Sequence, residues 1–219
     1  MTRVLPLGVL ISGEGTTLDA LAETIAGGHL PARICVVIAD RPHAPGVERA
    51  RRRGLPTAVI PFRGTSEEEW SRRVDRSLRD TGVELVVLAG FLAVLPGRLL
   101  ARWPGRVINV HPSLLPEFGG RGMFGMHVHE AVLAAGVAET GATVHLVTDD
   151  LDGGPKLLQE RVPVAPNDTA ESLRERVRPV ERRLLFDAIR HFADGDWSLP
   201  FTPPEERSPP REPRGARGS

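Results

Sequence analysis

The feature that most constrains the fold of this chain is an alternation of short apolar runs with amphipathic segments of helical length. Five apolar runs lie at residues 4–11, 33–39, 57–60, 85–89 and 107–110. Helix-like segments lie between them at 17–26, 45–53, 66–80 and 96–103. The hydrophobicity of the runs is continuous, as expected for strands of a parallel sheet that is covered on both faces. The sequence therefore predicts an α/β fold.

The pattern changes after residue 140. Two longer strand-like runs, 142–148 and 156–164, are joined by the turn sequence Asp152-Gly153-Gly154-Pro155. We expect a three-layer, Rossmann-like sheet that is mostly parallel and carries antiparallel strands at its C-terminal end.

A long helix is expected next, over residues 168–192. Asp168 or Thr169 would cap it, and Pro179 would kink it. We expect residues 1–200 to form a single domain. Residues 201–219 are rich in Pro, Arg, Glu and Gly and lack an apolar period, which predicts a disordered tail.

Composition excludes several classes of function. The chain has 28 basic and 28 acidic side chains, so overall attraction to nucleic acid is not expected. The single cysteine, Cys35, lies in an apolar run and cannot form a disulfide within the chain. No segment resembles a signal peptide or a membrane span, so we expect a cytoplasmic protein without membrane contact.

A glycine-rich loop follows the first apolar run. Gly13, Gly15, Thr16 and Thr17 lead directly into a helix, and backbone N–H groups at such a position can bind a phosphate. Glu14 must point away from an anion or hold a cationic part of the ligand. Two alternatives stay open, a purely structural turn and a dinucleotide site.

The dinucleotide alternative depends on two positions. Asp40 ends the second apolar run, where an acid that binds ribose is expected. Leu18, however, occupies the third glycine position of the dinucleotide motif and argues against it.

Three polar residues follow apolar runs and suit acyl chemistry. Asn109 and His111 are two positions apart on an expected strand, so both side chains lie on the same face. An amide N–H and an imidazole can stabilise a tetrahedral oxyanion, and Asp152 can stabilise the imidazolium. Because no Ser or Cys lies in a nucleophile elbow, direct transfer between bound substrates is favoured over a covalent intermediate.

Three histidines raise the question of a metal site. His127 and His129 fall on an expected helix over 126–135, where residues two apart point to different sides. His145 lies elsewhere in the sequence, and no cysteine pair or HExxH motif is present. We therefore expect no metal.

At these motifs the chain resembles the folate-dependent phosphoribosylglycinamide formyltransferases, from about residue 7 to residue 199. The motifs are Ser12-Gly13-Glu14-Gly15-Thr16, Val87-Leu88-Ala89-Gly90-Phe91, Asn109-Val110-His111-Pro112-Ser113-Leu114-Leu115-Pro116 and Asp149-Asp150-Leu151-Asp152-Gly153-Gly154-Pro155. The resemblance implies formyl transfer from 10-formyltetrahydrofolate to the amine of 5-phosphoribosylglycinamide, in purine biosynthesis. It implies these small molecules as partners of a monomer or homodimer.

The resemblance also implies roles for individual residues. Asn109 and His111 would stabilise the oxyanion, and Asp152 would pair with His111 and help to relay a proton. Glu181 would hold the ribose hydroxyls, and Arg178 would reach the phosphate. The acceptor phosphate would lie on Gly13, Glu14, Gly15, Thr16 and Thr17. The folate would lie against Leu88, Leu92, Val94, Leu95, Val147, Thr148, Asp149, Asp150 and Leu151.

Two departures from the family pattern bear on binding. Ala93 stands where an arginine often contacts the folate, which predicts a lower affinity for its glutamate tail. The segment 118–125 is longer than in many relatives and is expected to act as a mobile lid. Three alternative functions stay open: a 10-formyltetrahydrofolate hydrolase, a sugar-amine formyltransferase and a non-catalytic folate sensor.

Overall fold

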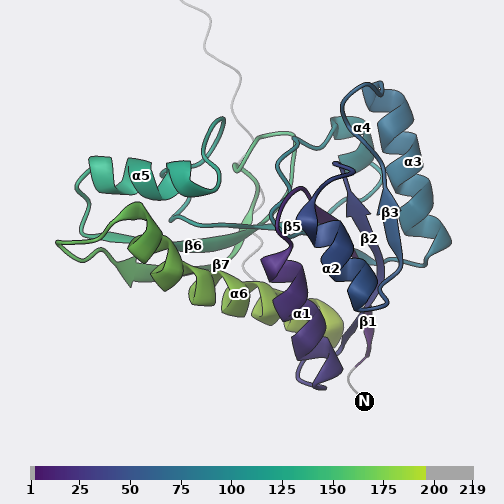
Figure 1. Ribbon diagram of the computed structural model, residues 1–219, viewed down its shortest axis with the longest axis horizontal. Helices are drawn as coiled ribbons and strands as arrows, with labels where there is room; N and C mark the ends of the chain where they lie inside the picture. The colour runs from purple at the N-terminus through teal and green to yellow at the C-terminus, as the bar shows by residue number, and fades with distance from the viewer. Residues whose placement is uncertain (1–2, 196–219) are drawn as a thin grey trace, which may run out of the picture.

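The computed structural model describes residues 3–195, which form one seven-stranded sheet with helices on both faces (Figure 1). The strands are β1 (Leu5–Ile11), β2 (Ala32–Ala39), β3 (Thr57–Val59), β4 (Leu85–Leu88), β5 (Val107–His111), β6 (Glu139–Leu146) and β7 (Lys156–Pro163). The helices are α1 (Thr16–Ala26), α2 (Pro45–Arg52), α3 (Glu67–Asp80), α4 (Gly97–Leu100), α5 (Met126–Ala134) and α6 (Ala170–Asp194). The expected three-layer α/β fold is confirmed.

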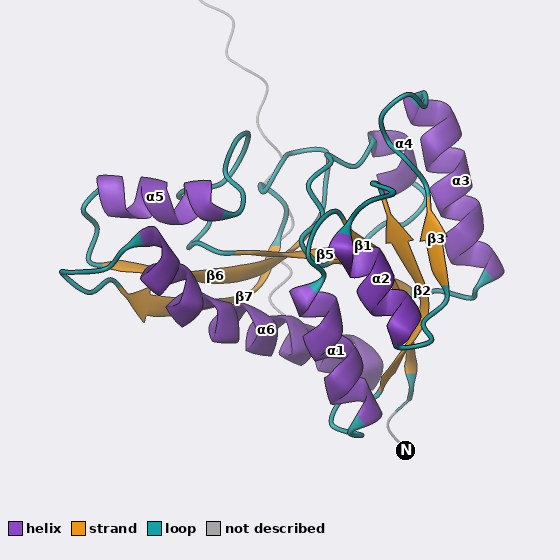
Figure 2. Cartoon of the chain, in the orientation of Figure 1, coloured by secondary structure: helices purple, strands orange, loops and turns teal. Residues whose placement is uncertain are grey.

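The strand order is β3-β2-β1-β4-β5-β6-β7, with the helices distributed on either side of the sheet (Figure 2). The pairs from β3 to β5 are parallel, whereas β5–β6 and β6–β7 are antiparallel. The antiparallel C-terminal strands are therefore also as expected.

Continuous hydrophobicity along β1 reflects burial on both sides, since all seven of its residues are buried. Leu7 and Val9 pack in the core beneath α1, α2 and α6, while Leu10 packs in the core beneath α3 and α4. Alternate residues of one strand therefore supply two separate cores, which is what a three-layer arrangement requires.

Several element boundaries differ from those expected. The helix expected over 96–103 is reduced to the short α4, because the following turn brings the Trp103 indole N–H to Asp75 Oδ1 at 3.0 Å. β6 ends at Leu146, so Val147 and Thr148 belong to the loop that follows. These boundaries depend on tertiary contacts rather than on local propensity.

The long C-terminal helix begins and ends later than expected. Thr169, not Asp168, is its N-cap, and Thr169 and Ser172 form a reciprocal capping box. The helix includes Pro179 and ends at Asp194, and its C-cap Gly195 has a φ of 71°. The expected disordered tail lies outside the described residues.

Within residues 3–195, no helix is long and apolar enough to cross a membrane. The same part of the chain contains no group of three or more His, Cys, Asp or Glu side chains placed to hold a metal ion.

Candidate active site

The predicted trio of Asn109, His111 and Asp152 comes together where β5 ends. Asn109 and His111 lie on β5, and Asp152 lies in the loop between β6 and β7. The His111 Nδ1 atom is 3.6 Å from Asp152 Oδ2, and His111 is only 4% exposed. A buried imidazole therefore faces a carboxylate, as the sequence suggested.

Both ring nitrogens of His111 face oxygen atoms. The Nε2 atom lies 2.8 Å from the carbonyl oxygen of Phe118, and Nδ1 faces Asp152. Asp152 Oδ2 also accepts a hydrogen bond of 2.9 Å from the backbone N–H of Gly120. Because an imidazolium can donate from both nitrogens, this arrangement suits the charged ring.

The sequence did not predict the partner of the Asn109 amide. Asn109 Nδ2 lies 3.2 Å from His145 Nε2, and His145 Nδ1 lies 3.0 Å from the carbonyl oxygen of Leu146. Burial outweighs the opposing charge of Asp152, whose Oδ1 atom lies 3.6 Å from Nε2, so it lowers the pKa of His145 and favours the neutral ring with its proton on Nδ1. Nε2 is then an acceptor for one amide N–H of Asn109, and the second amide N–H stays available to a ligand.

The contact between Asn109 and His145 depends on the register of β5 with β6, which the sequence does not show. From the sequence, His145 was therefore considered only as a possible metal ligand. Asn109 and His145 are cross-strand partners in this antiparallel pair. A prediction of that register would have found the contact, whereas the spacing of the two residues along the chain gives no signal.

The segment 118–125 contacts the same cluster, through the Phe118 carbonyl and the Gly120 N–H described above. Gly119 is required there, because a Cβ on it would come within 2.6 Å of Leu115 Cδ2 and 3.3 Å of Asp152 Cβ. The expected movement of this segment as a lid stays a prediction.

An amide donor, an imidazole and a carboxylate at one strand end can stabilise the oxyanion of an acyl transfer. Comparison with known proteins agrees with that chemistry. Residues 6–189 match the family described as formyl transferase. The chain is 34% identical to the phosphoribosylglycinamide formyltransferase of Haemophilus influenzae, over 88% of this chain and 89% of that protein. This chain belongs to the phosphoribosylglycinamide formyltransferase family.

Solved structures in the family share the fold. Glycinamide ribonucleotide transformylase 1 from Symbiobacterium toebii superposes with a TM-score of 0.82 at 40% identity, over 89% of this chain and 90% of that chain. The chain is also 40% identical, over 89% of its length, to the trifunctional purine biosynthetic protein adenosine-3 of Gallus gallus, but it spans only 19% of that protein.

The glycine-rich loop of this formyltransferase family member is held closely against α2. Gly15 has a φ of 73° and is the N-cap of α1, and a Cβ on it would lie 2.7 Å from Gly46 Cα. Glu14 is exposed, and its expected orientation, away from an anion or toward a cationic part of the ligand, stays a prediction. The Arg182 guanidinium on α6 donates to the Thr16 carbonyl at 3.4 Å, so α6 and the loop are in contact.

The two α6 residues that the resemblance assigned lie near a group of arginines. Arg178 forms an ion pair with Glu175 at 3.0 Å. Burial raises the pKa of Glu181 to about 7, although the positive charges of Arg178, Arg174 and Arg182 act in the opposite direction. The phosphate and ribose roles of these two residues stay predictions.

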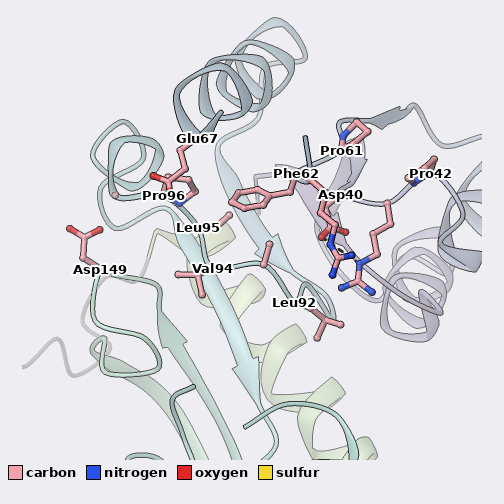
Figure 3. Close-up of a pocket in the computed structure, with 14 residues that line it drawn as sticks. Asp40, Pro42, Pro61, Phe62, Glu67, Leu92, Val94, Leu95, Pro96 and Asp149 are labelled. Atoms are coloured by element: carbon pink, nitrogen blue, oxygen red, sulfur yellow. Dashed lines mark ion pairs between the residues drawn. The ribbon is translucent and has the colours of Figure 1, made fainter. Parts of the chain in front are cut away.

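A pocket of about 940 Å³ lies beside the loop between β4 and α4 (Figure 3). Of the predicted folate contacts, Leu92, Val94, Leu95 and Asp149 line it. Leu88 instead packs in the core, and Val147 packs against that core. Thr148, Asp150 and Leu151 are exposed in the neighbouring loop.

The pocket is also lined by residues that the sequence analysis did not assign to folate. They are Asp40, Arg41, Pro42, Pro61, Phe62, Arg63, Glu67, Pro96 and Gly97, and Ala93 lines the pocket as well. Asp40 was expected to have a role only in the dinucleotide alternative. The strand order places the segments after β2 and β3 beside the loop between β4 and α4, and no local motif marks their residues.

Proposed function

We propose that this chain transfers the formyl group of 10-formyltetrahydrofolate to the amine of 5-phosphoribosylglycinamide, in purine biosynthesis. The observation that carries this proposal is the grouping of Asn109, His111 and Asp152 at the end of β5. Family membership supports it.

Each member of the trio has a distinct role in the proposed reaction. As the acceptor amine attacks the formyl carbon, a carbon–nitrogen bond forms and the formyl oxygen becomes an oxyanion. An Asn109 N–H donates to that oxyanion, and the positive charge of the His111 imidazolium stabilises it electrostatically while both ring nitrogens face the Phe118 carbonyl and Asp152. Loss of the folate nitrogen then breaks the second carbon–nitrogen bond, and a proton from the amine moves to that nitrogen.

Local groups must hold the acceptor, because the chain has no net charge to attract it. The backbone of Gly13 and Gly15 and the start of α1 offer N–H groups to a phosphate. Thr16 and Thr17 add hydroxyl donors. Glu181 on α6, the helix that contacts this loop through Arg182, is the proposed partner of the ribose hydroxyls.

Leu92, Val94, Leu95 and Asp149 are the proposed wall for the pterin of the formyl donor. No metal is needed for this chemistry. We further propose that this protein is cytoplasmic and that these two small molecules are its partners. That it is a monomer or a homodimer stays a prediction.

The direct test is to incubate the purified chain with 10-formyltetrahydrofolate and a panel of amines, and to identify products by mass. We expect formylation of 5-phosphoribosylglycinamide and release of tetrahydrofolate that depends on this acceptor. Formate production without any amine would instead indicate a hydrolase. Formylation of a sugar amine would indicate the second alternative, and tight folate binding without turnover would indicate a sensor.

Substitution of the trio tests the assigned roles. His111→Ala and Asp152→Asn should each lower kcat by about 10²–10⁴-fold, because each removes a group that acts in the transition state. The matched control is His43→Ala, since His43 is exposed and lies outside the trio. Circular dichroism should give the same spectrum for all three variants, and turnover near the wild-type value in either trio variant would reject its role.

A further inference from the structure

The two proposed substrate sites lie on loops that leave neighbouring strands. The acceptor loop, residues 13–17, follows β1, and the donor segment, residues 92–95, follows β4. β1 pairs with β4 in parallel, whereas β2 and β3 lie on the other side of β1. The strand order therefore reverses between β1 and β4, and α/β proteins bind ligands at such a point.

The two loops lead to opposite faces of the sheet. The acceptor loop enters α1, whose Leu18 and Leu21 are buried in the core that also contains residues of α6. The donor segment enters α4, whose Leu99 and Leu100 are buried in the other core, with residues of α3. Because the helices pack in separate layers, a contact between the loops themselves is needed to fix their separation.

Ser12 makes that contact with two hydrogen bonds. Its backbone N–H donates to the Gly90 carbonyl at 3.2 Å. Its hydroxyl accepts a hydrogen bond of 2.8 Å from the backbone N–H of Leu92, which is 80 positions away along the chain. Ser12 is only 3% exposed. A buried serine therefore joins the start of the acceptor loop to the start of the donor segment.

The bond to Leu92 depends on the side chain of Ser12. The ladder between β1 and β4 ends at the pair Leu10 and Leu88. Gly90, with a φ of 70°, then turns the chain out of the sheet, so the Leu92 N–H takes a side-chain acceptor. Within residues 3–195, no second acceptor lies within hydrogen-bond distance of this N–H.

The other contacts of the acceptor loop point away from the donor segment. The Gly13 carbonyl accepts a hydrogen bond of 3.0 Å from the Gly46 N–H on α2, and Gly15 packs against the same residue. Thr16 is held by Arg182 of α6. These contacts fix the loop relative to α2 and α6, but they do not fix it relative to the donor segment.

The separation of the two loops bears on the reaction because the site of formyl transfer is next to them. Asn109 of β5 is the cross-strand partner of Leu88, the last residue of β4. Reacting atoms must approach to about 3–3.5 Å, and a misplacement of about 1 Å can lower the rate by about 10²-fold. The contact at Ser12 therefore lies where alignment of the two substrates matters most.

We infer that Ser12 is a positioning residue, which fixes the acceptor loop against the donor segment and couples the binding of the two substrates. This inference rests on the proposed function. Without the hydroxyl, the phosphate retains the backbone N–H groups of its loop, and the pterin retains its apolar wall. The hydroxyl supplies their alignment. A ligand that orders one loop also orders the other through Ser12, so the second ligand meets a loop that is already ordered.

Ser12→Ala tests the alignment. In steady-state kinetics with 10-formyltetrahydrofolate and 5-phosphoribosylglycinamide, kcat should fall by about 10–100-fold. The KM for each substrate should stay within about twofold of the wild-type value, because the contacts that bind each substrate remain. A wild-type kcat would overturn the inference, and so would a higher KM at unchanged kcat.

The matched control is Ser71→Ala. Ser71 on α3 is also 3% exposed, and its hydroxyl has no hydrogen-bond partner among the described residues. This variant removes a buried hydroxyl that joins no loops, so it should retain the wild-type kcat and KM. An equal fall of kcat in both variants would overturn the inference.

Binding without turnover tests the coupling. Tetrahydrofolate carries no formyl group, so the acceptor can bind beside it without reaction. In calorimetry, saturating tetrahydrofolate should lower the Kd of 5-phosphoribosylglycinamide by about fivefold or more in the wild type. In Ser12→Ala the change should be less than about twofold. The same change in both chains, or no change in the wild type, would overturn the inference.

Failure of the inference and failure of the proposed function give different results. A wild-type chain that formylates no amine rejects the proposed function, whereas coupled binding that is lost in Ser12→Ala supports the link between the loops even then. Conversely, formyl transfer by the wild type with an unchanged kcat in Ser12→Ala rejects the inference alone.

Discussion

A buried histidine, His129, makes the stability of this chain depend on pH. His129 on α5 is 2% exposed, and its Nδ1 atom has no hydrogen-bond partner among the described residues. Burial lowers the pKa of His129 to about 4, and the positive charges of Arg174 and His111 act in the same direction. The folded chain therefore holds this ring neutral.

The low pKa of His129 predicts a loss of stability in acid. Between about pH 6.5 and pH 4 the unfolded chain binds a proton at this position and the folded chain does not, so the free energy of unfolding falls as the pH falls. Relative to His129→Gln, the wild type should lose about 2–3 kcal/mol across this window. Chemical denaturation at a series of pH values measures the difference.

The control for this experiment is His43→Gln, at an exposed position. A difference in the free energy of unfolding between wild type and His129→Gln that is the same at every pH would reflect packing alone. A difference that does not change from pH 7 to pH 4.5 would contradict the prediction.

The residue types at the site could be predicted from the sequence, but their contacts could not. The spacing of Asn109 and His111 on a strand correctly placed them on one face. The partner of Asn109 is His145, which is adjacent only because β5 and β6 pair in one register. Register depends on the whole sheet, so local patterns do not specify it.

At the scale of elements, the connection between β6 and β7 fixes the position of Asp152. The backbone N–H of Leu146 donates to the Pro155 carbonyl at 2.9 Å, and this hydrogen bond joins the two ends of the loop. A Cβ on Gly154 would lie 1.9 Å from the Leu146 carbonyl oxygen. Only glycine fits there, which explains the second glycine of the Asp152-Gly153-Gly154-Pro155 turn.

Gly154→Ala should therefore force the loop away from β6. We expect a loss of about 1–3 kcal/mol in the free energy of unfolding. Because Asp152 would move with the loop, kcat should fall by about tenfold or more. Urea denaturation and steady-state kinetics measure the two effects.

The matched control is Gly27→Ala. Gly27 has a φ of −74°, and the nearest neighbour of a Cβ there is the flexible side chain of His29, at 3.0 Å. Its effect should stay within about 0.5 kcal/mol. Equal effects of the two substitutions would contradict the explanation for Gly154.

Strands and helices with strong patterns could be predicted well from the sequence. The helix expected over 66–80 is α3, and the hydroxyl of its N-cap Ser66 accepts a hydrogen bond from the Glu69 N–H. The extent of α4 was wrong, because the contact between Trp103 and Asp75 turns the chain after Leu100. Such a contact joins distant segments and leaves no periodic signal.

At the scale of the whole molecule, both cores and the described site lie within residues 3–195. We propose that residues 1–200 form a domain that folds and transfers formyl groups on its own. A chain ending at residue 200 should unfold within about 2 °C of the full chain, because it retains both cores that residues 3–195 form. Calorimetry and kcat measure this, and a markedly lower Tm would contradict the proposal.

The sequence by itself determined the α/β class, the two glycine-containing turns and the identity of the three polar residues that meet at the end of β5, because these depend on periodicity and on short motifs. Only the tertiary structure decided which groups surround them. The His145 partner of Asn109 and the pocket residues Arg41 and Arg63, which follow β2 and β3, are brought into place by strand order and register. Those are properties of the assembled sheet, in which residues far apart along the chain become neighbours.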